Sequence, residues 1–295
     1  MEDLPQITES VCLPVNIPIY PYLLDHCFLG KPVFPAVEAM QVLAQAVIGY
    51  APDADITAIT EAKFNKFLYI RDSRTQIAAT CDATIFENGD ITAVLKTKSK
   101  SERTAITRTK EHVAIRIPHS KPIFPAIPFE LGWAGFEIDE EISAGQIYRD
   151  LVPFGPAYHN ILDTLYISDE GAIAKLSAPK NDDQTSMPGP LGSPFVLDAA
   201  FHTACAWGQR YAQIVAFPIG IEKRIIFKPT QAGKTYMNRI TPVRKDPDLL
   251  VFDMWIFDEN GIVFESTSGV HMRDVSGGRL KPPRWIIDNA EKHSL

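Results

Sequence analysis

Two strongly apolar segments of helical length stand in a chain that otherwise has the pattern of strands, and each begins directly at a proline. The first covers residues 36–50 after Pro35, and the second covers residues 195 to about 211 after Ser193 and Pro194. Proline fits the first turn of a helix, where its missing N–H needs no intrahelical acceptor, and serine is a typical N-cap. Helices this apolar must be buried, and the partner that a strand-rich chain offers is a sheet. The chain is therefore expected to pack strands around two helices.

The segments around these helices repeat in order. Asn88-Gly89 and Asn260-Gly261 each predict a tight hairpin, because Asn-Gly supplies the positive φ angles of a type I′ turn. A proline-started helix followed by strands and an Asn-Gly hairpin, occurring twice, predicts an internal duplication; a chance likeness is the alternative. The predicted fold is α+β, a double hot-dog in which each antiparallel sheet wraps one long helix. The predicted strands, rich in β-branched and aromatic residues, lie in residues 11–17 (at an edge), 56–69, 75–86, 91–98, 112–117 and 146–177.

A proline-rich segment separates the two halves. Four prolines fall within residues 118–128, a density that neither a helix nor a central strand tolerates. The predicted boundaries are residues 1–120 for the first hot-dog, 121–135 for the linker and 136–295 for the second hot-dog.

The composition limits the partners and the location. A net charge of −7 without a dense basic stripe argues against a nucleic-acid binder. The N-terminal residues lack the basic and apolar regions of a secretory signal, and no apolar run is long enough to cross a membrane. The four cysteines are scattered, so neither a structural zinc site nor a disulfide framework is expected. A cytoplasmic protein that contacts neither nucleic acid nor membrane is the expectation.

Two sites on or beside the helices carry ionisable side chains. The first helix has a polar stripe of Glu38, Gln41 and Gln45 on one face. His26 comes just before this helix, so its imidazole is expected beside the helix N-terminus, where partial positive charge stabilises an oxyanion. An ordinary loop histidine is the alternative. Asp198 and His202 lie four residues apart on the second helix, among apolar residues that should raise the pKa of the carboxyl. A purely structural pair is the alternative there.

The motifs around these residues resemble those of dehydratase domains in polyketide synthases and related fatty-acid-making systems. His26-x3-Gly30-x4-Pro35 is similar to their first active-site motif, although Ala36 stands where many members have a second glycine. The sequence GKPVFPAVEAMQ around this motif is more similar to the dehydratases of the polyunsaturated-fatty-acid type. The sequence Asp198-x3-His202 is similar to the motif of the second hot-dog.

A third family motif, Gly-Tyr-x-Tyr-Gly-Pro-x-Phe, resembles the sequence LVPFGPAY. Gly155 and Pro156 are retained, and Tyr158 keeps an aromatic ring at the last position. Val152 and Phe154 replace the two tyrosines of the motif. Any hydrogen bond that those hydroxyls give to a substrate is therefore missing.

The resemblance implies an enzyme that removes water from a 3-hydroxyacyl thioester on an acyl carrier protein, giving a 2-enoyl thioester in polyketide or fatty-acid biosynthesis. Neutral His26 would take the C2 proton, and protonated Asp198 would give a proton to the departing hydroxyl. The two side chains should then lie roughly 4–7 Å apart. No metal ion or organic cofactor is needed. The residues implied to position the substrate are Gly30, Pro35, Gly155, Pro156, Tyr158 and His202.

Other functions and partners stay open at this point. The same His/Asp pair would serve a double-bond isomerase or a cyclase like the product-template domains, and a non-catalytic acyl-binding docking module is a third alternative. A homodimer, the acyl chain length, the stereochemistry and the extent of the natural protein are undecided. An acidic chain meets a generally acidic carrier protein only through a local basic patch. The predicted patch is Lys223, Arg224 and Lys228 with Arg210, Arg239 and Arg244, unless these residues only guard a strand edge.

Overall fold

The first half of the fold is built around the helix expected after Pro35. The helix α1 covers Ala36–Tyr50, and Pro35 is its N-cap rather than its first residue. The expected edge strand is longer than predicted, β1 (Ile7–Pro18), and lies at one edge of the large sheet. The other elements are η1 (Pro21–Asp25), β2 (Cys27–Phe28), β3 (Lys31–Phe34), β4 (Ala58–Phe64), β5 (Leu68–Tyr69), β6 (Gln76–Phe86), β7 (Ile91–Lys100) and β8 (Thr107–Ile117). The computed structural model describes residues 6–71, 75–100, 107–122, 136–180 and 189–287.

The second half is built around α3 (Pro194–Tyr211), which has Ser193 as its N-cap. The strand prediction was wrong for residues 146–151, which are helical, in α2 (Ala144–Gln146) and the π-helical turn η2 (Ile147–Leu151). Ser143 and Gln146 form a capping box, and this local signal starts the helix. The other elements are β9 (Glu140–Ser143), η3 (Pro156–Tyr158), β10 (Ile161–Ser168), β11 (Gly171–Ser177), β12 (Phe217–Ile226), β13 (Thr235–Lys245), β14 (Leu250–Phe257) and β15 (Val263–Arg273).

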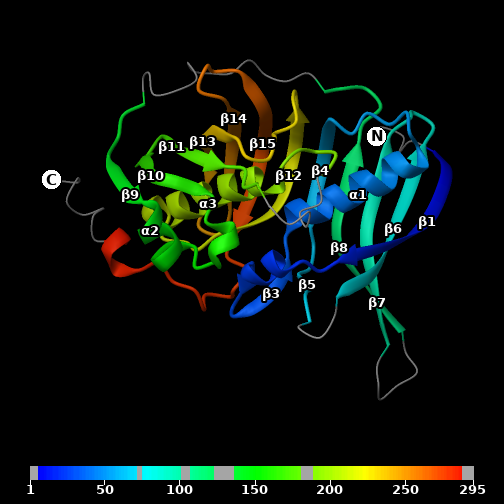
Figure 1. The fold of residues 1–295 in the computed structure, drawn as a ribbon, viewed down its shortest axis with the longest axis horizontal. Helices are drawn as coiled ribbons and strands as arrows, with labels where there is room; N and C mark the ends of the chain where they lie inside the picture. The colour runs from blue at the N-terminus through cyan, green and yellow to red at the C-terminus, as the bar shows by residue number, and fades with distance from the viewer. Residues whose placement is uncertain (1–5, 72–74, 101–106, 123–135, 181–188, 288–295) are drawn as a thin grey trace.

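The order of the strands in the sheet repeats in the two halves of the chain. The large antiparallel sheet runs β1-β6-β7-β8-β4-β12-β15-β14-β13-β11-β10-β9. Only strands of the large sheet are counted, which leaves out β5. Outward from the central β4–β12 pair, each half begins with the first strand after its helix, continues with the fourth, third and second strands after the helix, and then has a strand that precedes the helix. Each half wraps its part of the sheet around one long helix, and the two halves lie side by side (Figure 1). This is the predicted α+β double hot-dog.

The two Asn-Gly hairpins are real but do not occupy equivalent places. Asn88-Gly89 follows β6 and leads into β7, whereas Asn260-Gly261 lies between β14 and β15. Neither turn is of the predicted type I′, because only the glycines have a positive φ angle, +82° at Gly89 and +77° at Gly261. This pattern is that of a type I turn closed by a left-handed glycine. The topology, and not the hairpins, is what repeats.

The polar stripe of α1 is buried and links the two halves. Only Gln45 is exposed, while Glu38 and Gln41 are each 2% exposed, so the expected division into a polar and a buried face was wrong. Gln41 Nε2 donates to the Gly192 carbonyl at 2.6 Å, and its Oε1 accepts from the Leu191 N–H at 2.9 Å. The Gln41 side chain thus provides hydrogen-bond partners for a carbonyl and an N–H of the loop that leads into α3.

No helix within the described residues combines the length and the apolar character needed to cross a membrane.

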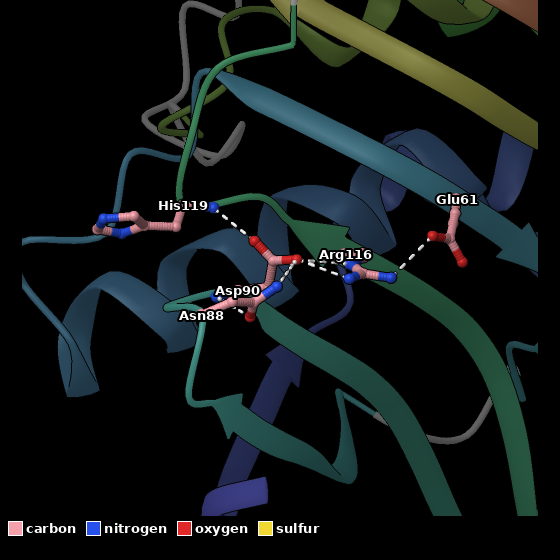
Figure 2. A network of polar contacts seen from close by, with 5 residues as sticks. All are labelled: Glu61, Asn88, Asp90, Arg116 and His119. Carbon is pink, nitrogen blue, oxygen red and sulfur yellow. Dashed lines mark hydrogen bonds and ion pairs between the residues drawn. The ribbon is translucent and has the colours of Figure 1, made fainter. Parts of the chain in front are cut away.

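A polar network fixes the point at which the chain leaves the first half (Figure 2). Arg116 on β8 donates to Asp90 Oδ2 through Nε and Nη2, at 3.1 and 2.6 Å, and to Glu61 through Nη1 at 3.0 Å. Asp90 Oδ1 accepts a hydrogen bond from the backbone N–H of His119 at 2.8 Å.

The predicted linker lies mostly outside the described residues, since these omit 123–135, and the domain boundaries stay predictions.

Candidate active site

His26 lies between η1 and the small hairpin of β2 and β3, with its ring orientation fixed from one side. Its Nδ1 donates to the Val33 carbonyl at 3.0 Å. Because a carbonyl oxygen only accepts, the neutral ring carries its hydrogen on Nδ1 and keeps a lone pair on Nε2. That atom faces Asp198 Oδ1 of α3 at 3.9 Å, at the lower limit of the expected separation. Two side chains from opposite halves of the fold therefore meet at one point.

Asp198 and His202 are buried together on α3. His202 Nε2 lies 3.0 Å from Asp198 Oδ2, and the two residues are 4% and 6% exposed. Burial raises the pKa of the Asp198 carboxyl, but the close contact with the His202 imidazole and the nearby His26 outweigh burial and hold the pKa below its ordinary value. The expectation that apolar surroundings alone keep this carboxyl protonated was therefore wrong, because two imidazoles face it.

The third motif packs on the segment that carries His26. Gly155 N–H donates to the Asp25 carbonyl at 2.8 Å, and a Cβ atom at Gly155 would lie 2.3 Å from Asp25 Cγ. The rings of Phe154 and Tyr158 flank the His26 ring, with centroid distances of 4.4 and 5.0 Å. Only a glycine allows this approach, so the motif braces His26. Pro156 is exposed and begins η3.

Gly30 and Pro35 lie farther from the pair. Gly30 stands with Leu29 in the exposed two-residue turn between β2 and β3, with φ angles of +73° and +50°. Pro35 is buried, and its neighbours Phe34 and Ala36 line the cavity described below, whereas neither Pro35 nor Gly30 does. The two motif residues belong to the segment between His26 and α1, and the structure does not bring them to the His26–Asp198 pair.

A cavity of about 1020 Å³ opens beside the pair. His26, Asp198, His202 and Cys205 are among the residues that line it. Its walls come from both halves of the fold, as the segments 64–69 and 213–219 show. Among the residues that the structure describes, no three His, Cys, Asp or Glu side chains gather as metal ligands would.

Comparisons with known proteins identify the family and the fold to which this chain is similar. The family described as "Polyketide synthase dehydratase N-terminal domain" matches residues 138–282. The chain is 21% identical to polyketide synthase PksM of Bacillus subtilis over 91% of its own length and 6% of that protein. It is 24% identical to a polyunsaturated fatty acid synthase of Thraustochytrium sp. over 78% of its length and 8% of that protein. Residues 138–282 of this chain thus belong to the polyketide synthase dehydratase family. The whole chain spans less than a tenth of either relative.

Solved structures support the fold of the dehydratase domain. A monomeric dehydratase domain from a trans AT polyketide synthase split module has a TM-score of 0.73 at 12% identity, covering 91% of this chain and 100% of the other. A bifunctional dehydratase-cyclase domain in ambruticin biosynthesis has a TM-score of 0.66 at 16% identity, covering 91% and 96%. The double hot-dog fold is thereby confirmed, and dehydration in polyketide synthesis is the general role of the family.

The predicted basic patch is not one continuous surface, because part of it is buried. Arg224 is 1% exposed and forms two hydrogen bonds with Glu265, at 2.7 and 2.9 Å. Arg210 is 3% exposed and donates to Glu140 at 2.7 Å. A buried, paired guanidinium cannot meet a carrier protein, so the docking prediction was wrong for these two residues. The other four predicted residues, Lys223, Lys228, Arg239 and Arg244, do not line the cavity either.

One buried polar group, Tyr148, was missed from the sequence, and the burial of another, Glu38, was not predicted. The Tyr148 hydroxyl lies 3.4 Å from His202 Nδ1, and the capping box just before it was the signal that could have placed it on a helix. Glu38 accepts a hydrogen bond from the Tyr22 hydroxyl at 2.9 Å, and burial raises the pKa of this carboxyl to about 7. Tyr158 is 1% exposed, and its hydroxyl has no hydrogen-bond partner among the described residues.

Proposed function

We propose that this dehydratase domain removes water from a 3-hydroxyacyl thioester and releases a 2-enoyl thioester. The observation that carries the proposal is the pairing of an imidazole with a buried carboxyl at the wall of the cavity. His26 Nε2 and Asp198 Oδ1 are 3.9 Å apart. Elimination across one C2–C3 bond needs a base and an acid within reach of neighbouring carbon atoms. The reaction requires no metal ion or organic cofactor.

His26 is the base in this proposal. Burial lowers the pKa of its imidazole below 6.5 despite the nearby Asp198, so the ring is neutral at neutral pH. Its Nδ1–H is held by the Val33 carbonyl, which leaves the lone pair on Nε2 to take the C2 proton. The thioester carbonyl would be polarised at the first turn of α1, where Ala36 lines the cavity and the N–H groups have no intrahelical acceptor.

The acid is the Asp198–His202 pair holding one extra proton. Asp198 Oδ2 and His202 Nε2 are in contact, so the proton can reside on either group until Asp198 delivers it. As the C2 proton moves to His26, the C2–C3 double bond forms, the C3–O bond breaks, and the departing hydroxyl leaves as water with the proton from the pair. The proton on His26 then returns to Asp198 across 3.9 Å, which restores both groups.

Conversion of a small 3-hydroxyacyl thioester tests the proposal directly. The full chain is expected to convert a pantetheine or N-acetylcysteamine thioester to a product lighter by one water, measured by mass spectrometry and by the absorbance of the conjugated enoyl thioester. A product of unchanged mass with a moved double bond, or a ring formed without loss of water, would instead indicate the isomerase or the cyclase. Binding without conversion would indicate the docking module.

The carrier of the acyl chain is proposed to be an acyl carrier protein. The cavity lining includes exposed basic residues and fewer acidic ones, although the whole chain has a net charge of −7. Such a local positive field attracts an acidic partner and acts chiefly on the rate of encounter. The basic residues are Lys66, Lys110, Arg273 and Lys281, and the acidic residues near them are Asp248 and Asp274.

Reversal of Lys66 and Lys110 to Glu is expected to lower kcat/KM for a carrier-bound substrate by about 10-fold at low salt, because electrostatic steering is lost. Added salt should slow the wild type more than the variant. The small thioester should be converted as before by both proteins. Reversal of Lys228 and Lys234, two exposed lysines outside the cavity, is the matched control and should leave both substrates unaffected. Equal slowing on the small thioester would contradict a role in docking.

A further inference from the structure

Tyr148 is buried beside the acid pair, and the proposed reaction does not use it. Its hydroxyl oxygen accepts the backbone N–H of Ile161 at 2.7 Å and lies 3.4 Å from His202 Nδ1. The other ring nitrogen of His202 lies 3.0 Å from Asp198 Oδ2. Tyr148, His202 and Asp198 therefore form a chain of polar contacts that ends at the cavity, and Tyr148 itself is 5% exposed.

The Tyr148 hydroxyl can serve both protonation states of the pair. The Ile161 N–H occupies one lone pair of its oxygen, which leaves one further lone pair and one hydrogen. When the pair lacks the extra proton, the hydroxyl donates to Nδ1, and His202 then carries its hydrogen on Nε2, which lies 3.0 Å from Asp198 Oδ2. When the pair holds the extra proton, on either residue, Nδ1 carries a hydrogen and the hydroxyl accepts it.

We propose that Tyr148 is a positioning residue whose hydroxyl gives His202 Nδ1 a partner in both protonation states of the acid pair. The inference rests on the proposed dehydration and assigns a further residue to it. Without this partner, one state of the buried imidazole would leave a ring nitrogen unsatisfied, which is costly. The third motif makes the role specific to this chain, because Val152 and Phe154 bring no hydroxyl, and the Phe154 ring packs on His202 at 5.2 Å.

Tyr148→Phe is expected to lower kcat by about 5- to 100-fold, the cost of leaving a buried polar nitrogen without a partner. KM should change little, because Tyr148 does not line the cavity. Both protonation states lose a partner at Nδ1, but the hydrogen bond that the protonated imidazole donates is the stronger of the two, so the alkaline limb of the pH profile of kcat should move to lower pH. The Phe ring keeps the stack on His159, whose ring centroid is 4.3 Å away.

The same substitution made in a His202→Gln variant tests whether Tyr148 acts through His202. In His202→Gln the side chain has no ionisable nitrogen, so adding Tyr148→Phe should change kcat by less than about 2-fold and should not move the limb. Tyr236→Phe is the matched control for loss of a buried hydroxyl, since Tyr236 accepts the Gln231 N–H at 2.7 Å outside the cavity. The other titratable groups that face the pair are unchanged within each comparison and are His26, Glu38, Tyr158, His159 and Cys205.

The tautomer of His202 tests the inference without any turnover. In the wild type at alkaline pH, ¹⁵N NMR of the imidazole, assigned by its absence in His202→Gln, should show the hydrogen on Nε2. In Tyr148→Phe that preference should be lost. A hydrogen on Nδ1 in the wild type, an unchanged tautomer in the variant, or an equal loss of kcat in both backgrounds would overturn the role of Tyr148. Failure of the dehydration assay with the expected tautomer would instead contradict the proposed function.

Discussion

His26→Ala is expected to reduce kcat for dehydration by about 10²–10⁴-fold or more, the usual contribution of a general base. The reason is the single orientation of the ring: Nδ1–H is held by the Val33 carbonyl, and Nε2 alone faces the cavity and Asp198. The measurement is steady-state turnover of a small 3-hydroxyacyl thioester. KM should change less than kcat, because the walls of the cavity remain.

The control for His26→Ala is a histidine that lies elsewhere. His271 on β15 contacts Glu222 Oε1 at 2.8 Å and does not line the cavity, so His271→Ala should keep wild-type turnover. The pH profile gives a second reading. Because burial lowers the pKa of His26, the neutral base persists below pH 6.5, and kcat/KM should fall only as the pH drops through a lower value. Near-normal turnover of His26→Ala would reject this residue as the base.

The parts of the site that the sequence predicts are those that depend on local spacing. Asp198 and His202 lie four residues apart on a helix, so their contact at 3.0 Å follows from helical geometry. The helix after Pro35 likewise follows from one proline and an apolar run. The double hot-dog follows from the repetition of these helices in a strand-rich chain. The approach of His26 to Asp198 was expected from the resemblance, since no spacing brings them together.

The errors concern contacts between distant segments. Arg224 belongs to a basic stretch in the sequence, but its partner Glu265 is on the neighbouring strand β15 and takes it out of reach of any carrier. In the sequence Gln41 belongs to a polar face of the first helix, but in the structure the loop before α3 covers its side chain. The pKa of Asp198 is a different case, because its direction was judged from the apolar neighbours without the charge of His202 on the same helix, to which His26 from the other half adds.

The hairpins show the opposite error, in which a strong local signal was given too much meaning. Asn88-Gly89 and Asn260-Gly261 do form turns, yet they connect strands that are not equivalent. A hairpin signal depends on a few residues and arises easily by chance. The strand order depends on the whole sheet, and it repeats in both halves. For a duplicated fold, the helices and the strand order are therefore better indicators than the turns.

Asp198→Asn is expected to reduce kcat for the 3-hydroxyacyl thioester by about 10²–10⁴-fold, because the amide has nearly the shape of the carboxyl but cannot deliver its proton. His202 Nε2 would keep a neighbour at the position now 3.0 Å away, so the fold should be retained. Equal melting temperatures of variant and wild type would check this. Asp163→Asn, at a residue outside the cavity, is the matched control and should keep full turnover.

The leaving group separates the role of Asp198 from that of His26. In a 3-fluoroacyl thioester the C3 substituent departs as fluoride, a far weaker base than hydroxide, and its departure needs little protonation. Asp198→Asn should therefore recover most of its lost rate on the fluoro substrate, whereas His26→Ala should stay impaired because the C2 proton must still be removed. An equal defect of Asp198→Asn on both substrates would contradict an acid role. The carboxyl would then act only by holding His26, whose Nε2 lies 3.9 Å from it.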